Sequence, residues 1–254
     1  MAEEKIRVAA VSYLNTKPLL FGLRDASVAD QLVLSMDYPA KIGQQLIADE
    51  VDLALIPVAL IPQLPEHYIV SDYCIGADGP VASVCLFSDV PMEEIENVYL
   101  DYQSRSSVTL VRLLLRKYWK VRPVLLQASA GYEQKINGTT AGVVIGDRAL
   151  QLRSRHRYIY DLAEAWINFA GLPFVFAAWV SNKKLPASFI GDFNKATGLG
   201  TTGEALEKVI AENPCDFFDL HDYYTKHISF TLDADKKKGL EKFLQYLRQP
   251  LERS

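Results

Sequence analysis

The segment Tyr13 to Pro18 carries polar side chains at the point where an apolar, strand-like run stops. Asn15 and Thr16 are residue types that cap helices, and Pro18 suits the first turn of a helix, where its missing N–H costs nothing. A strand that passes directly into a helix points unpaired backbone N–H groups, and the positive end of the helix dipole, at one place. With Lys17 beside it, this junction predicts a binding site for an anionic group. An ordinary capped helix start is the alternative.

A second junction of the same kind lies in the middle of the chain, in the segment LDYQSRSSVTL. Hydroxyl groups and free N–H groups at a helix N-terminus, next to a guanidinium group, would suit a carboxylate. The alternative is plain capping, with the guanidinium group facing solvent. Two junctions favour a ligand with two anionic groups, held across a cleft. The candidate residues are Ser104, Arg105, Ser106, Ser107 and Thr109.

Further candidates stand where other apolar runs end. Pro57 closes the run DLALIP, and Gly146 and Asp147 follow the run VVI. Glycine permits a close backbone approach, and Asp147 is expected to cap the following helix, with catalysis as the second interpretation. Ligands of open α/β sheets bind outside the carboxyl ends of the strands, so we expect these residues and Ser83 to meet the two junctions.

Several common catalytic and cofactor motifs are absent. The glycines form neither G-x-G-x-x-G nor a P-loop, so there is no dinucleotide or ATP signature. The motifs G-x-S-x-G and H-E-x-x-H do not occur, and the four histidines lack metal-ligand spacing. The three cysteines form no C-x-x-C pair, which argues against a disulfide framework or a zinc site.

Composition restricts the class of protein. The chain has 254 residues, 49% of them hydrophobic and 23% charged, with a formal net charge of −4 at pH 7. This charge argues against a nucleic-acid partner, and no apolar run is long enough to cross a membrane. The acidic residues near the start do not fit a signal peptide, so we expect a cytoplasmic protein. The oligomeric state stays open.

Alternation of strands and helices predicts an α/β fold with a mostly parallel sheet. We expect strands at residues 5–13, 31–36, 51–57, 67–76, 81–88, 97–102, 122–127, 141–146 and 174–180. We expect helices after residue 16 and within residues 40–49, 104–119, 147–153, 161–170, 185–213 and 233–248, the last capped by Asp233.

The runs SVCLFS and FVFAAWVS bracket the middle of the chain and are expected to cross between two lobes. The predicted layout is a discontinuous first α/β lobe, residues 1–86 plus 181–254, with a second α/β lobe, residues 87–180, inserted in it. Two crossover strands of this kind form a hinge, with a cleft between the lobes.

The motifs SYLNTKPL, DLALIPVAL, SVCLFS, LDYQSRSSVTLVRLLL, IGDRAL and GLPFVFAAW, in this order, resemble the chorismate dehydratase family of the futalosine route to menaquinone. The resemblance covers about residues 6 to 180 and continues more loosely to the end. It implies a type II periplasmic-binding-protein fold with the ligand in the cleft. A sister family, 1,4-dihydroxy-6-naphthoate synthase, differs from this chain at the first junction.

The resemblance implies a hydro-lyase that converts chorismate, a dicarboxylate, to 3-[(1-carboxyvinyl)oxy]benzoate and water, with no redox cofactor or metal. Two carboxylates would match the two junctions. Asn15 and Ser83 are the expected catalytic residues, and the substrate's enolpyruvyl carboxylate is the expected base, with Asp147 as the alternative base. The alternative functions are the sister enzyme and a non-catalytic small-anion binding protein.

Overall fold

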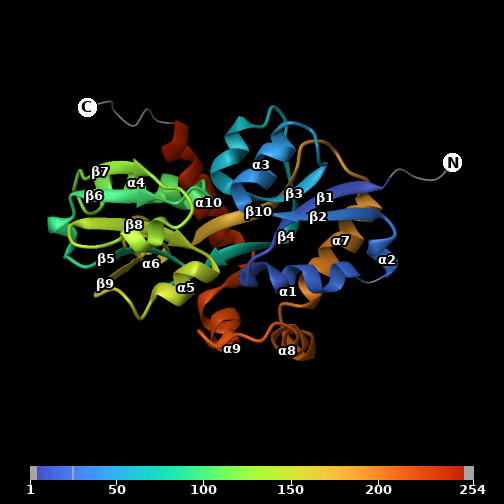
Figure 1. The fold of residues 1–254 in the computed structure, drawn as a ribbon. Helices are drawn as coiled ribbons and strands as arrows, with labels where there is room; N and C mark the ends of the chain where they lie inside the picture. The colour runs from blue at the N-terminus through green and yellow to red at the C-terminus, as the bar shows by residue number, and fades with distance from the viewer. Residues whose placement is uncertain (1–4, 25, 249–254) are drawn as a thin grey trace.

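The computed structural model of the chain describes residues 5–24 and 26–248. These residues form two α/β lobes that lie side by side, each built on one β-sheet (Figure 1). The first sheet has the strand order β11-β4-β10-β3-β1-β2, and the second has the order β7-β6-β8-β5-β9. The predicted α/β fold with two lobes is confirmed.

The first sheet contains β1 (Ile6–Val11), β2 (Leu32–Asp37), β3 (Leu53–Pro57), β4 (Tyr68–Ala77), β10 (Phe174–Ser181) and β11 (Ser229–Thr231). The second sheet contains β5 (Val84–Ser88), β6 (Asn97–Leu100), β7 (Val124–Gln127), β8 (Thr140–Ile145) and β9 (Tyr158–Asp161). Every expected strand overlaps an observed one. The short strands β9 and β11 were not predicted, because three or four residues carry little periodicity.

The expected mostly parallel sheet is wrong, because both sheets are mixed. In the first sheet β1 pairs in parallel with β2 and β3, whereas β10 runs antiparallel between β3 and β4. In the second sheet β6 pairs in parallel with β7 and β8, whereas β5 runs antiparallel between β8 and β9. The antiparallel interior strands β10 and β5 are those by which the chain enters a sheet from the other lobe. They therefore run in the opposite direction to their neighbours.

The chain leaves the first sheet between β4 and β5 and returns to it between β9 and β10. By sheet membership, β5 lies with the inserted segment and β10 with the first lobe. The division into residues 1–86 plus 181–254 and residues 87–180 stays a prediction. All five residues of β3 and all eight of β10 are buried, so these two strands form the centre of the first lobe's core.

Helices cover the faces of the two sheets (Figure 1). The α-helices are α1 (Lys17–Leu20), α2 (Ala26–Ala29), α3 (Pro39–Ile47), α4 (Ser106–Lys117), α5 (Asp147–Leu152), α6 (Leu162–Ala170), α7 (Ala187–Leu199), α8 (Gly203–Glu212), α9 (Leu220–Asp222) and α10 (Ala234–Arg248). Shorter 3-10 turns include η1 (Leu14–Thr16), η2 (Phe21–Arg24), η3 (Val58–Gln63), η4 (Met92–Glu94) and η5 (Tyr132–Lys135), and a π-helix follows α9 (Tyr223–His227). Asp233 accepts a hydrogen bond from the backbone N–H of Lys236 at 2.8 Å, which confirms the predicted cap of α10.

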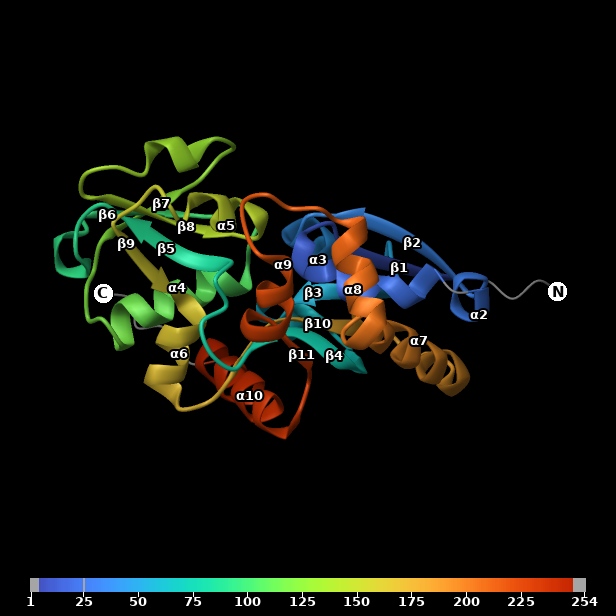
Figure 2. The same cartoon turned by 90° about the horizontal axis from the view of Figure 1, so that it is seen from below.

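The C-terminal part of the chain packs where the two lobes meet, as the view from below shows (Figure 2). There, the ring of Trp166 on α6 lies 5.9 Å from that of Phe243 on α10, and the ring of Phe174 on β10 lies 4.9 Å from Phe243. Helix α6 precedes the return of the chain to the first sheet, and β10 follows it. Both elements therefore pack with α10 in one aromatic cluster. Within the described ranges, no helix has the length and hydropathy needed to cross a membrane.

Candidate functional site

A cavity of about 60 Å³ lies between the two lobes, where β1 and β3 of the first sheet and β8 of the second end. Small-molecule pockets usually measure roughly 300 Å³ or more, so this pocket is small for a ligand site. Eight of the twelve predicted site residues line it, namely Asn15, Thr16, Pro57, Ser83, Ser104, Ser106, Ser107 and Gly146. The pocket lining does not include Lys17, Arg105, Thr109 and Asp147.

Most of the remaining pocket wall is apolar. It includes Val11, Leu55, Ile75, Val81, Val84, Ile145 and Phe176. The lining contains no lysine or arginine. An anionic group in this pocket would therefore be met by backbone N–H groups, hydroxyl groups and the Asn15 amide, while the apolar walls suit a carbon ring.

The first junction differs from its prediction in how its polar side chains are used. Pro18 lies in the first turn of α1, as expected, but neither Asn15 nor Thr16 caps a helix with its side chain. Instead the Thr16 hydroxyl donates to Oδ1 of Asn15 at 3.1 Å. Because α1 has only four residues, its dipole contributes little. The predicted side-chain caps are wrong here, and the two polar side chains hold each other at the pocket.

The second junction starts α4, a helix of twelve residues. Oγ of Ser104 accepts a hydrogen bond from the backbone N–H of Ser107 at 3.1 Å, so Ser104 satisfies one N–H group at the helix start. The Ser106 hydroxyl donates to the carbonyl of Phe176 at 2.9 Å and accepts from the N–H of Ala59 at 3.2 Å. Ser106 thus ties the start of α4 to the first lobe.

Arg105 and Thr109 do not contribute to this pocket as predicted. Arg105 is exposed, and its Nη1 donates to the carbonyl of its neighbour Ser104 at 3.2 Å. Thr109 lies one turn into α4, where its backbone N–H bonds to the carbonyl of Arg105. Neither residue therefore lines the pocket, although both belong to the segment that starts α4.

Gly146 and Asp147 meet the first junction from the second lobe. Gly146 has φ 65° and ψ −146°, a conformation that is essentially restricted to glycine. A Cβ atom there would lie 2.9 Å from the ring of Tyr13. The expected cap of α5 by Asp147 is wrong, because its Oδ1 accepts from the backbone N–H of Leu14 at 3.1 Å instead. Burial raises the pKa of this carboxyl group.

Ser83 stands in the passage between the two sheets, after a strained residue. Ala82 is buried and has φ 62°, which is uncommon for alanine. Its N–H donates to Oδ2 of the buried Asp161 at 2.8 Å, and its carbonyl accepts from Nη1 of Arg153 at 3.0 Å. The carbonyl of Ser83 accepts from the N–H of Gly146 at 2.8 Å. These bonds hold the backbone before Ser83 in a conformation that it would not adopt alone.

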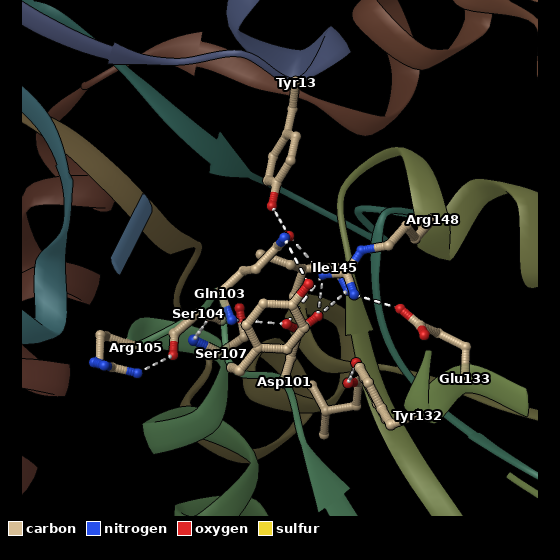
Figure 3. Close-up of polar contacts among 12 residues, drawn as sticks. Tyr13, Asp101, Gln103, Ser104, Arg105, Ser107, Tyr132, Glu133, Ile145 and Arg148 are labelled. Atoms are coloured by element: carbon tan, nitrogen blue, oxygen red, sulfur yellow. Dashed lines mark hydrogen bonds and ion pairs between the residues drawn. The ribbon is translucent and has the colours of Figure 1, made fainter. Parts of the chain in front are cut away.

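A polar network joins the lobes beside the pocket (Figure 3). Nη2 of Arg148 donates to both oxygens of the fully buried Asp101 carboxylate, at 3.0 and 2.7 Å, and to Oε1 of Gln103 at 2.8 Å. Nη1 of Arg148 pairs with Glu133. The same Gln103 oxygen accepts from the Tyr13 hydroxyl of the first lobe. The carboxylates of Asp101 and Glu133 fix the position of the Arg148 guanidinium group. The guanidinium group in turn orients the Gln103 side chain toward Tyr13.

The network residues were not predicted from the sequence. Tyr13, Gln103 and Arg148 each lie inside a segment quoted above, but none of them was named as a site residue. Their spacing in the chain matches no motif, because Gln103 and Arg148 meet only in the folded second lobe, and Tyr13 joins them from the first lobe. Within the described parts of the chain, no group of three or more His, Cys, Asp or Glu residues is arranged to hold a metal ion.

Comparison with known proteins finds a matching family model and relatives of known name. A family model described as menaquinone biosynthesis matches residues 6–249. The chain is 26% identical over 245 residues to a chorismate dehydratase of Thermus thermophilus, covering 84% of this chain and 85% of the relative. It is also 26% identical over 243 residues to a chorismate dehydratase of Campylobacter jejuni, covering 92% and 94%.

Solved structures share the fold at low identity. The protein AF1704 of Archaeoglobus fulgidus has a TM-score of 0.72 at 13% identity, covering 96% of this chain and 97% of its own. The alkanesulfonate-binding protein SsuA of Xanthomonas axonopodis, bound to MOPS, has a TM-score of 0.62 at 12% identity, covering 100% and 96%. A Candida albicans protein described as having the generic periplasmic binding protein fold has a TM-score of 0.60 at 13% identity, covering 99% and 92%. The fold is therefore periplasmic-binding-protein-like.

Proposed function

The chain belongs to the menaquinone biosynthesis family, and we propose that it is a chorismate dehydratase, which converts chorismate to 3-[(1-carboxyvinyl)oxy]benzoate and water. The observation that carries this proposal is that Asn15 and Ser83, far apart in the sequence, line one pocket between the lobes. The names of the two curated relatives supply the substrate.

The pocket's chemistry suits this substrate. Chorismate has a carbon ring and two carboxylates, and its hydroxyl and enolpyruvyl ether stand on neighbouring ring carbons. The apolar wall would contact the ring. Ser104 and Ser107 would offer their hydroxyl groups to the carboxylates, and the start of α4 would add the positive end of a twelve-residue helix dipole.

The reaction removes one proton and one hydroxide from neighbouring carbons. The C–H bond at the carbon that bears the ether breaks, and its electron pair becomes a ring double bond. The C–O bond to the hydroxyl group breaks at the next carbon, hydroxide leaves with that electron pair, and the proton and hydroxide form water. The ring becomes aromatic, so orientation and proton transfer are the main tasks of the protein.

The base in this proposal is the substrate's own enolpyruvyl carboxylate. Asn15 orients that carboxylate toward the ring proton, and Ser83 donates a hydrogen bond to the departing hydroxyl. Asp147, the alternative base, does not line the pocket, and its Oδ1 is bound to the N–H of Leu14. This position supports the substrate's carboxylate over Asp147.

The test compares three variants for consumption of chorismate. Asn15→Ala and Ser83→Ala should each lower kcat about 100-fold while thermal melting shows a folded protein, as for the loss of one donor to developing charge. Asn137→Ala, which removes an exposed amide of the second lobe, is the matched control and should behave as the wild type. Wild-type rates in both site variants would overturn the assignment of these residues.

A further inference from the structure

A buried tyrosine of the C-terminal segment reaches the pocket residue Ser83. The hydroxyl of Tyr223 lies 2.7 Å from Oγ of Ser83, across 140 residues of sequence. Tyr223 is fully buried, and its ring lies 5.8 Å from the ring of Phe218 and 5.5 Å from that of Tyr224. Packing on both sides therefore fixes where the phenol group points.

The backbone that carries Tyr223 is unusual. Residues Tyr223–His227 form a π-helix, a rare element that occurs often at functional sites. The neighbouring Tyr224 points its hydroxyl to the carbonyl of Leu14 at 2.9 Å. Two consecutive tyrosines thus reach two segments of the pocket wall, Ser83 and the first junction.

The direction of the hydrogen bond follows from acidity. A phenol is a stronger acid than an aliphatic hydroxyl group, so Tyr223 donates and Oγ of Ser83 accepts. Burial raises the pKa of Tyr223 further, and the phenol keeps its proton at any physiological pH. Tyr223 is therefore a permanent donor.

This bond leaves the proton of Ser83 available. The backbone N–H of Ser83 bonds to the carbonyl of Val81 at 2.7 Å, and its carbonyl accepts from Gly146. Among the residues that the structure describes, Oγ of Ser83 has no hydrogen-bond acceptor. Since Ser83 lines the pocket, its O–H group has a ligand in the pocket as its remaining partner.

We propose that Tyr223 is a positioning residue, which fixes Ser83 as a hydrogen-bond donor to a ligand oxygen in the pocket. This inference rests on the proposed dehydratase function, in which that oxygen belongs to the departing hydroxyl group. Without the phenol, the Ser83 hydroxyl rotates freely and can present a lone pair to the substrate. Its donor geometry is then lost for most of the time, although Ser83 itself remains.

The test is a double-mutant cycle on kcat and KM for chorismate, with the wild type, Tyr223→Phe, Ser83→Ala and the double variant. Tyr223→Phe keeps the ring and its packing, and should lower kcat about 10-fold, with KM changed less than about 3-fold. In the Ser83→Ala background, the same substitution should change kcat less than about 2-fold, because no serine remains to be positioned.

Tyr224→Phe is the matched control, since it removes the hydroxyl of the adjacent buried tyrosine, which bonds to Leu14 rather than to Ser83. Its effect on kcat should be the same in both backgrounds. Equal losses from Tyr223→Phe in both backgrounds, or no loss in either, would overturn the role of Tyr223 while leaving the dehydratase function standing. A wild type that leaves chorismate unchanged refutes the proposed function, and the inference with it.

Discussion

The backbone N–H of Leu14, in the first lobe, donates to the carboxylate of Asp147, in the second lobe, at 3.1 Å. Next to it, the ring of Tyr13 lies against Gly146, and the Tyr13 hydroxyl donates to Gln103. These contacts join the lobes at the rim of a pocket of about 60 Å³. We expect these contacts to separate when the pocket opens to admit a ring-bearing dicarboxylate.

Asp147→Asn should retain most of the activity. The carboxamide oxygen can still accept from Leu14, so we expect kcat within about 3-fold of the wild type. Asp147→Ala removes the acceptor and should raise KM and lower the melting temperature by a few degrees, as for one lost hydrogen bond. A loss of more than about 100-fold in kcat in Asp147→Asn, with chorismate affinity intact, would make Asp147 the base.

Gly146→Ala should damage both stability and affinity. The new Cβ atom would meet the Tyr13 ring at 2.9 Å, and the backbone has φ 65°. We expect a loss of about 2 kcal/mol or more in the free energy of unfolding and a raised KM. Gly138→Ala, at φ 54° with open space around it, is the control. Equal changes of KM in both variants would contradict the contact with Tyr13 as the cause.

Gln103→Leu should weaken closure rather than catalysis. It removes the oxygen that receives hydrogen bonds from both Tyr13 and Arg148. We expect KM to rise about 10-fold, equivalent to about 1.4 kcal/mol, with kcat changed less. X-ray scattering of the ligand-free protein should show a larger radius of gyration. Gln134→Leu, at an exposed position of the second lobe, should change neither quantity. An unchanged KM and radius in Gln103→Leu would refute the role in closure.

Asp52 should stabilise the protein in a pH-dependent way. Burial pushes its pKa up, but hydrogen bonds from Arg7 and Lys183 more than offset this and lower the pKa to about 2. Because the folded-state pKa lies below the unfolded value of 3.8, the stabilisation is complete above about pH 4. It is lost as the pH falls from there toward 2.

Asp52→Asn should therefore lower the free energy of unfolding by about 2 kcal/mol at pH 7 and by much less at pH 2.5. Urea unfolding at both values measures the difference. Asp235→Asn, which breaks an exposed pair with Lys238, should have little effect at either pH. A difference between wild type and Asp52→Asn that is equally large at pH 2.5 would contradict the lowered pKa. Asp52 precedes β3, whereas the pocket residue Pro57 ends it, so turnover should not depend on Asp52.

The sequence predicts the strands well where apolar runs are long. β1, β3 and β10 lie in such runs, which are apolar because most or all residues of these strands are buried. Strand direction is not encoded locally, which is why the antiparallel placement of β10 and β5 was missed. The direction depends on where the chain passes between the lobes, and that is a tertiary property.

The candidate site was predictable to the extent that strand ends gather at one edge. Asn15 and Gly146 line one pocket for this reason, whereas Ser83 precedes β5, whose start lies beside the end of the antiparallel strand β8. The direction of a side chain at a helix start depends on the phase of the helix, which placed Arg105 outside the pocket. Tyr223 reaches the site from a separate segment through a π-helix, and nothing in its local sequence indicates this contact.

The most direct test of the central claim is the identity of the product. The purified protein should be incubated with chorismate in the presence of a chelator, and the products separated by liquid chromatography and identified by mass spectrometry. The dehydratase function predicts a product lighter than chorismate by one water, with the enolpyruvyl ether retained and the absorbance of an aromatic ring. Chorismate that binds but stays intact, or that does not bind at all, would contradict it and favour the binding-protein or naphthoate-forming alternative.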